Sequence, residues 1–93
     1  MSNIDLNTRL SRSLDLLVSE MDGKIVMMNI ETGAYYGLEG VAAEIWTFLE
    51  NPSDVKAVCT HLQGKYEIDE KTCEEETIAF LNQMERKNTI IIE

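Results

Sequence analysis

The chain has 93 residues, and its 17 acidic and 8 basic side chains give a formal net charge of −9 at pH 7. This length allows one domain with a modest core. The negative charge disfavours nucleic acid and anionic lipid as partners because it repels their phosphates. The N-terminal residues do not form a signal peptide, and no apolar run approaches the roughly 20 residues that span a bilayer. We therefore expect a cytoplasmic protein.

Residues 1–13 are polar with isolated apolar residues, which is typical of a flexible N-terminal arm, so the single domain is expected over residues 14–93. Residues 14–20 and 24–30 predict two strands, and Asp22 with Gly23 is a strong signal for the hairpin turn between them. A second turn over residues 31–33 returns the chain as a third strand over residues 34–38. Strand alternation places Tyr36 toward the core and Tyr35 away from it.

Apolar residues at three- and four-residue spacing predict two helices after the sheet. The first runs from Gly40 to about residue 50, where Pro52 prevents its continuation. Ser53 is then expected to cap a second helix, which continues to about Tyr66.

Asp69 is expected to cap a third and longest helix over residues 70–87, with acidic residues near its start and basic residues at its end, as the helix dipole favours. Its predicted inward stripe contains Cys73, Thr77, Phe80, Leu81 and Met84. Ile78 lies outside this stripe, on a flank that also carries Glu74, Asn82 and Glu85. The last apolar run, over residues 90–92, is compatible with a short strand and with a hydrophobic tail.

Three strands followed by three helices predict an α+β fold of the winged helix-turn-helix kind, with the three-stranded antiparallel sheet at the N-terminal end. Catalysis is not expected, because His61 is the only histidine and no nucleophile and base accompany it. Cys59 and Cys73 are interpreted as buried free thiols, and no metal-ligand spacing occurs. We therefore predict neither a metal nor a cofactor.

Two features admit both a structural and a functional interpretation. The acidic residues between positions 69 and 76 are compatible with a solvated helix start and with a surface that attracts a basic peptide. Tyr35 and Ile78 are large apolar residues off the inward faces, as the groove of a peptide-binding protein requires. Scattered exposed apolar residues are also common in proteins that bind nothing there.

The chain resembles the PqqD-like proteins, which are leader-peptide recognition elements for ribosomally made, post-translationally modified peptides (RiPPs). The resemblance rests on the strings YYGL over residues 35–38, AEIW over 43–46 and FL over 80–81 with Met84 following, and it covers about residues 14–92. The arm over residues 8–13 and the single-domain length resemble the standalone members of lasso-peptide systems. Departures from the family pattern are Gly40 at a helix cap and residues 87–89, where the family often has a glycine.

This resemblance implies a small winged-helix-like module without catalytic residues that binds a precursor's leader as an added strand. The leader would lie against the third strand, over residues 32–38, and in a groove with the third helix. The implied partners are the leader, a leader peptidase and a cyclase or other modifying enzyme. The implied peptide-binding residues are Thr32, Ala34, Tyr35, Tyr36, Gly37, Leu38, Glu74, Ile78, Leu81 and Glu85.

The main alternative is a winged-helix regulator that binds DNA, which would require a basic recognition helix. The third helix instead begins with acidic residues, and the second carries only Lys56 and Lys65 as lysines or arginines. A small enzyme is a weaker alternative still, because one histidine and two helix-borne thiols do not supply an acid, a base and a nucleophile.

Overall fold

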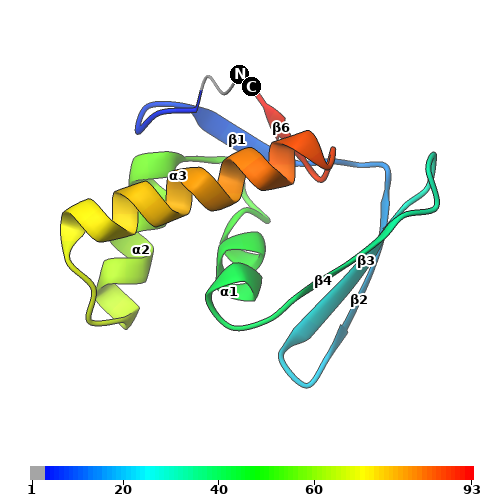
Figure 1. Ribbon diagram of the computed structural model, residues 1–93, viewed down its shortest axis with the longest axis horizontal. Helices are drawn as coiled ribbons and strands as arrows, with labels where there is room; N and C mark the ends of the chain where they lie inside the picture. The colour runs from blue at the N-terminus through cyan, green and yellow to red at the C-terminus, as the bar shows by residue number, and fades with distance from the viewer. Residues whose placement is uncertain (1–3) are drawn as a thin grey trace.

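The computed structural model describes residues 4–93 and contains three helices and two small antiparallel sheets (Figure 1). The elements in chain order are β1 (Arg9–Arg12), β2 (Leu16–Met21), β3 (Lys24–Asn29), β4 (Tyr35–Leu38), α1 (Val41–Phe48), β5 (Ser53–Asp54), α2 (Val55–Lys65), α3 (Glu70–Arg86) and β6 (Ile90–Ile92). The predicted α+β class, with three helices and an antiparallel three-stranded sheet, is confirmed. Among the described residues, no helix is both long and apolar enough to cross a bilayer.

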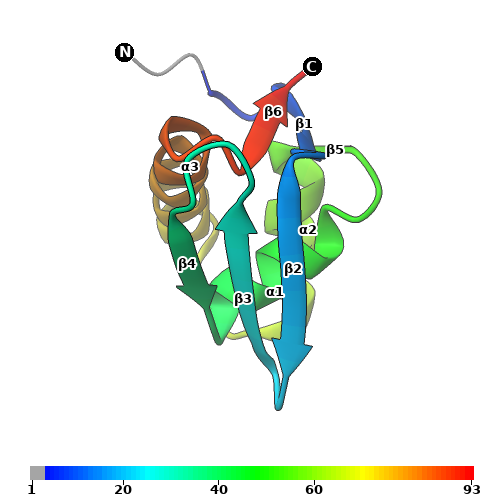
Figure 2. The same ribbon diagram turned by 90° about the vertical axis from the view of Figure 1, so that its right-hand side faces the viewer.

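The larger sheet has the order β2-β3-β4 and is the antiparallel meander that the sequence predicts. Asp22 and Gly23 form the first hairpin turn with φ values of 53° and 78°, the left-handed conformation that an Asp-Gly turn supplies. Ile25, Met27 and Leu38 point to one face of this sheet and are buried. The helices lie behind that face in Figure 2, so the sheet packs its apolar side on them.

The smaller sheet has the order β5-β1-β6 and corrects the expectation of a flexible arm over residues 1–13. Leu10 is 0% exposed and pairs with Ser53 on one side and Ile92 on the other. The buried Leu10 side chain and the backbone pairing of β1 with β5 and β6 hold residues 9–12 in place, although their composition is polar. Residues 1–3 of the expected arm lie outside the described part of the chain. The run over residues 90–92 is a strand and not a tail.

The helix caps agree in part with the prediction. Asp69 caps α3 as expected, since its carboxylate accepts a hydrogen bond of 3.0 Å from the Thr72 N–H. Asp54 caps α2 in place of Ser53, because Ser53 pairs with β1 and the helix begins one residue later. The Asp54 carboxylate accepts from the Ala57 N–H at 2.8 Å. Gly40 precedes α1 with a φ of 62° and no side-chain cap.

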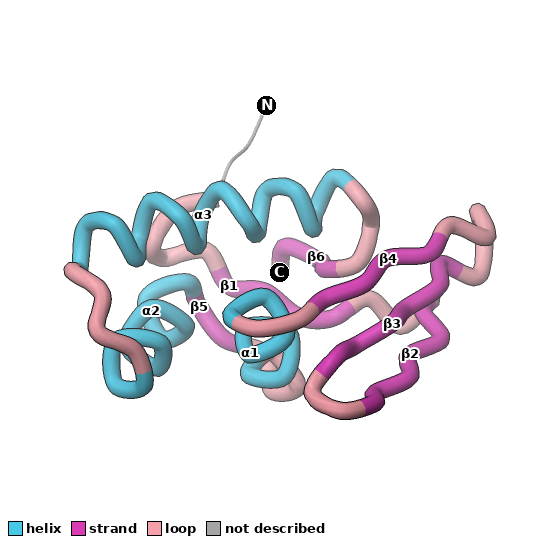
Figure 3. The backbone as a smooth tube through the Cα atoms, turned by 60° about the horizontal axis from the view of Figure 1, so that its bottom comes forward, coloured by secondary structure: helices cyan, strands magenta, loops and turns pink. Residues whose placement is uncertain are grey.

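One core joins all these elements. Figures 1 and 3 show α1 between α2 and the β2-β3-β4 sheet, with a short loop leading from β4 directly into α1. The core contains Trp46 of α1, Val58 of α2 and Leu81 of α3, each at most 2% exposed. Because this core holds α1 and α3 in place, it also determines which residues of these two helices lie near β4.

Candidate functional site

β4 is an edge strand whose only partner in the sheet is β3. The Asn29 N–H donates to the Ala34 carbonyl at 2.9 Å, and Tyr36 and Leu38 are opposite Met27 and Ile25. Antiparallel pairs alternate, so every second residue of β4 directs its N–H and C=O toward β3. Tyr35 and Gly37 therefore direct their N–H and C=O groups to the open edge. An exposed edge of this kind accepts another strand.

The side chains of β4 alternate as predicted. Tyr35 is 70% exposed on the outer face, whereas Leu38 is buried and Tyr36 is half-buried against the core. Gly37 has open space where a Cβ would stand, so an alanine fits at this position. The edge of β4 thus combines two free backbone positions with an aromatic ring on the outside.

α3 lies on the β4 side of the sheet in Figures 1 and 2. The Lys87 Nζ, just after the end of α3, is 5.2 Å from the centroid of the Tyr36 ring, which shows which flank of the helix faces β4. A helix turns by about 100° per residue, so Gln83, Phe80 and Glu76 lie on the same flank as Lys87. We call these four residues the cleft flank, and we use the name cleft for the surface that this flank forms with the open edge of β4 and the hollow described next.

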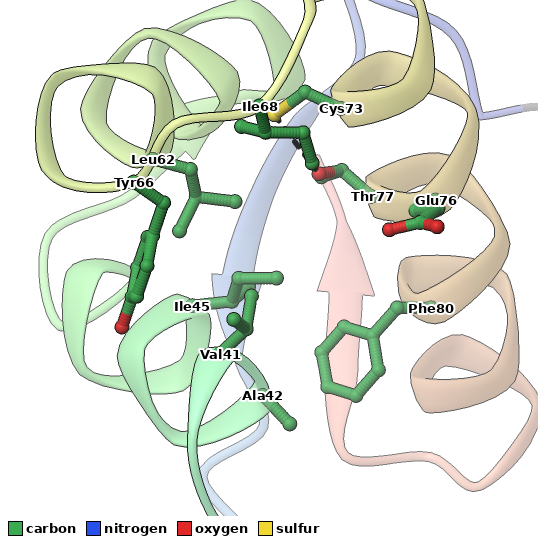
Figure 4. A pocket seen from close by; sticks show the side chains of 10 residues that line it. All are labelled: Val41, Ala42, Ile45, Leu62, Tyr66, Ile68, Cys73, Glu76, Thr77 and Phe80. Carbon is green, nitrogen blue, oxygen red and sulfur yellow. Dashed lines mark hydrogen bonds between the residues drawn. The ribbon is translucent and has the colours of Figure 1, made fainter.

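A hollow of about 240 Å³ lies next to this flank, between α1 and α3 (Figure 4). Its walls are mostly apolar, and Figure 4 shows the Phe80 ring opposite Val41 and Ala42. Glu76 is its one acidic lining residue. The lining residues are Val41, Ala42, Ile45, Leu62, Tyr66, Ile68, Cys73, Glu76, Thr77 and Phe80. The size and apolar lining of the hollow fit one apolar side chain.

The structure does not bring all the predicted binding residues of α3 to this cleft. Ile78 precedes Phe80 by two positions and is therefore rotated by about 160° from it around the helix. Glu74 and Glu85 share the Ile78 flank, which faces away from β4. Leu81 is 0% exposed and presents no side-chain surface to a peptide. The sequence places an apolar stripe on α3 but does not say which of its two flanks meets the sheet.

Thr32 and Ala34 belong to the turn that precedes β4. The Asn29 Oδ1 accepts from the Thr32 N–H at 3.1 Å, and the Thr32 hydroxyl accepts from the Ala34 N–H at 3.2 Å. These contacts shape the start of β4. The sequence analysis does not place Gln83 and Lys87 at the site and considers Glu76 only as part of the acidic run over positions 69–76, although the spacing of these residues with Phe80 places all four on one flank.

The outer face of the β2-β3-β4 sheet is unusually apolar. Leu17, Met21, Val26 and Tyr35 are between 45% and 71% exposed. Three of them, Leu17, Val26 and Tyr35, line one shallow depression with Met28. This face borders the open edge of β4.

Titratable groups elsewhere have structural roles. The Glu44 carboxylate lies 2.8 Å from the His61 Nε2 and also accepts from Lys65, and these contacts, the His61 one first, lower the Glu44 pKa. They join α1 to α2. Cys59 and Cys73 are free and buried, as predicted, and burial raises the Cys59 pKa to about 11. A thiol in that state is a poor nucleophile. Within residues 4–93, no group of three potential metal ligands is present.

Comparison with known proteins agrees with this geometry. The family model for coenzyme PQQ synthesis protein D (PqqD) matches residues 24–90, from the start of β3 to the start of β6. The chain belongs to the PqqD family. The matched part of this PqqD family member includes β4, α1 and the whole of α3, which form the cleft.

Two solved structures are similar to this PqqD family member. TbiB1 in complex with the TbiA(beta) leader peptide is 25% identical, with a TM-score of 0.82 over 86% of this chain and 93% of that one. Lasso peptide synthetase B1 complexed with the leader peptide is 20% identical, with a TM-score of 0.79 over 88% of this chain and 96% of that one, and this likeness concerns the fold. No curated protein sequence matches the chain.

Proposed function

We propose that this protein is a non-catalytic RiPP recognition element that binds the leader of a precursor peptide by strand addition to β4. The open edge at Tyr35 and Gly37 is the observation that carries the proposal, because it offers unpaired backbone groups on a strand that leads directly into α1, one wall of an apolar hollow. Main-chain hydrogen bonds then supply affinity, and the hollow between α1 and α3 selects an apolar side chain. Family membership and the leader-bound TbiB1 support the same assignment.

The second half of the proposal is presentation of the bound precursor to a processing enzyme in the cytoplasm, such as a lasso-peptide leader peptidase. It is supported by the apolar outer face of the β2-β3-β4 sheet, which an added strand on β4 would extend. An exposed apolar surface of this kind is typical of a protein interface.

The strand addition is tested by Gly37→Pro, with Gly37→Ala as the matched control. Proline removes the N–H at the open edge while the hydrogen bonds of Tyr36 and Leu38 with β3 remain, and edge strands tolerate proline. Alanine keeps the N–H, and its Cβ meets no atom within 4 Å. Ligands are selected from a displayed library of random peptides of about 12 residues, long enough to cover β4 and its flanks, and the binding constants are measured by calorimetry.

We expect Gly37→Pro to weaken binding about tenfold or more, since it removes a hydrogen bond and leaves a peptide carbonyl unpaired. Gly37→Ala should bind nearly as well as wild type. Equal affinities of the proline and alanine variants would exclude strand addition at β4. Failure of the wild-type protein to enrich any peptide would contradict the proposed function as a whole.

The winged helix-turn-helix interpretation, in which α2 and α3 would form the DNA-reading pair, is not favoured by any feature of the site. The first half of α3 exposes Glu70, Glu75 and Glu76. These carboxylates would repel a DNA backbone. We expect no shift of a random duplex in a gel at low salt.

A further inference from the structure

The cleft has opposite charges at its two ends. Glu76 lines the hollow beside α1, and Lys87 lies over Tyr36 at the other end of α3. The two residues are eleven positions apart, which is close to three helical turns, so they lie on the same side and about 16 Å apart along the axis. Within residues 4–93, neither is paired with an opposite charge.

The direction of β4 relates these charges to a bound strand. β4 runs from Tyr35 to Leu38 with Lys87 over the Tyr36 ring in its first half, and the chain then enters α1, which lines the hollow together with Glu76. A strand added antiparallel to β4 therefore runs from the Glu76 end to the Lys87 end. All pairings in this sheet are antiparallel, and this arrangement has the more favourable hydrogen-bond geometry. A strand rises about 3.4 Å per residue and only every second side chain points toward α3, so the two peptide residues that meet these charges are about four or six positions apart.

We propose that the cleft recognises a peptide with a defined charge order: a basic residue followed, about four or six positions later on the same face of the strand, by an acidic residue. The basic side chain meets Glu76 at the mouth of the hollow, and the acidic side chain meets Lys87. The inference rests on the proposed strand addition and specifies its substrate class. Two charges of opposite sign distinguish a correctly placed peptide from a shifted or reversed one, which backbone hydrogen bonds alone do not do.

The proposal is tested by exchanging the two charges in the double variant E76K/K87E. The outer ridge of α3 offers a matched control, E75K/R86E. Glu75 and Arg86 are exposed, are also eleven positions apart and are rotated by about 100° away from the cleft flank. Both double variants keep the net charge. Circular dichroism and thermal unfolding establish that each variant folds.

Each protein selects from the same displayed library of random peptides of about 12 residues. We expect the wild type and E75K/R86E to enrich peptides in which the basic residue precedes the acidic one, and E76K/K87E to enrich the reverse order. For one enriched peptide, exchange of its two charged residues should weaken wild-type binding about tenfold, because two attractive pairs become repulsive. The exchange should restore binding to E76K/K87E, and this difference should shrink at about 0.5 M salt.

Enriched peptides without a charge order, or with the acidic residue first, would overturn the proposal. The same result follows if E76K/K87E selects the wild-type order. In these cases the loss of affinity with Gly37→Pro still supports strand addition, so the two proposals fail separately.

Discussion

Substitution of Arg12 should destabilise the protein far more than its place in a polar N-terminal segment suggests. Arg12 lies in β1, and its guanidinium donates two hydrogen bonds to the Trp46 carbonyl of α1, at 3.0 and 2.7 Å. The same group lies 4.7 Å from the Trp46 ring centroid. Arg12→Ala removes both interactions and leaves the carbonyl of a buried residue unpaired.

The magnitude follows from these contacts. Hydrogen bonds to a charged group contribute about 1.5–3 kcal/mol, and a cation over a tryptophan ring contributes about 1 kcal/mol. Since both share one guanidinium, we expect a loss of about 3 kcal/mol in the free energy of unfolding for Arg12→Ala. Arg12→Lys keeps the charge but not the fork of donors, so it should lose about half as much. For a domain of this size, 3 kcal/mol lowers Tm by roughly 12–24 °C.

Urea unfolding followed by circular dichroism measures these changes. Arg9→Ala is the matched control, because Arg9 is on the same strand and forms only an exposed ion pair of 3.2 Å with Glu93. This control should lose less than about 1 kcal/mol. A similar small loss for Arg12→Ala would refute the conclusion that β1 is fastened to α1 through this side chain.

Two further predictions concern the helices. The contacts of Glu44 with His61 and Lys65 lower its pKa below the ordinary 4.5, so their stabilisation is present above pH 4.5 and is lost as the pH falls through the lower folded value. Glu44→Gln should therefore show a smaller decrease of the urea midpoint than wild type between about pH 4.5 and 3, and an unchanged pH dependence would contradict this role. Asp54→Ala should cost about 1 kcal/mol by removing the α2 cap, whereas Asp54→Asn should cost little. The urea midpoints of the two variants distinguish a cap at Asp54 from a cap at Ser53. If Ser53 were the cap, Asp54→Ala would leave the midpoint unchanged.

Local signals in the sequence were sufficient for most elements. Asp22 and Gly23 encode the left-handed turn that they form, and Asp69 encodes the start of α3. β1 was missed because its burial depends on Leu10 alone, and its partners Ser53 and Ile92 are far away in sequence. Pairing over such separations leaves no periodic pattern.

The cleft was predictable from its strand and not from its helix. The β4 string contains its own alternation, so the outward Tyr35 and inward Tyr36 followed from a local rule. For α3, the apolar stripe is equally compatible with β4 on either side, and Ile78 drew attention to the flank that faces away. The orientation in which α3 packs on α1 and the sheet determines which flank of α3 faces β4. The sequence of α3 alone does not specify this orientation.

The small sheet also affects how the chain folds as it is synthesised. β1 is synthesised well before its longer partner, β6, which spans residues 90–92, and the Glu93 N–H donates back to the Arg9 carbonyl at 2.9 Å. The β2–β3 and β3–β4 hairpins can form from local contacts long before then. Leu10 can pair with Ile92 only after all three helices and Ile92 itself have left the exit tunnel, so β1 reaches its paired position later than the hairpins can form.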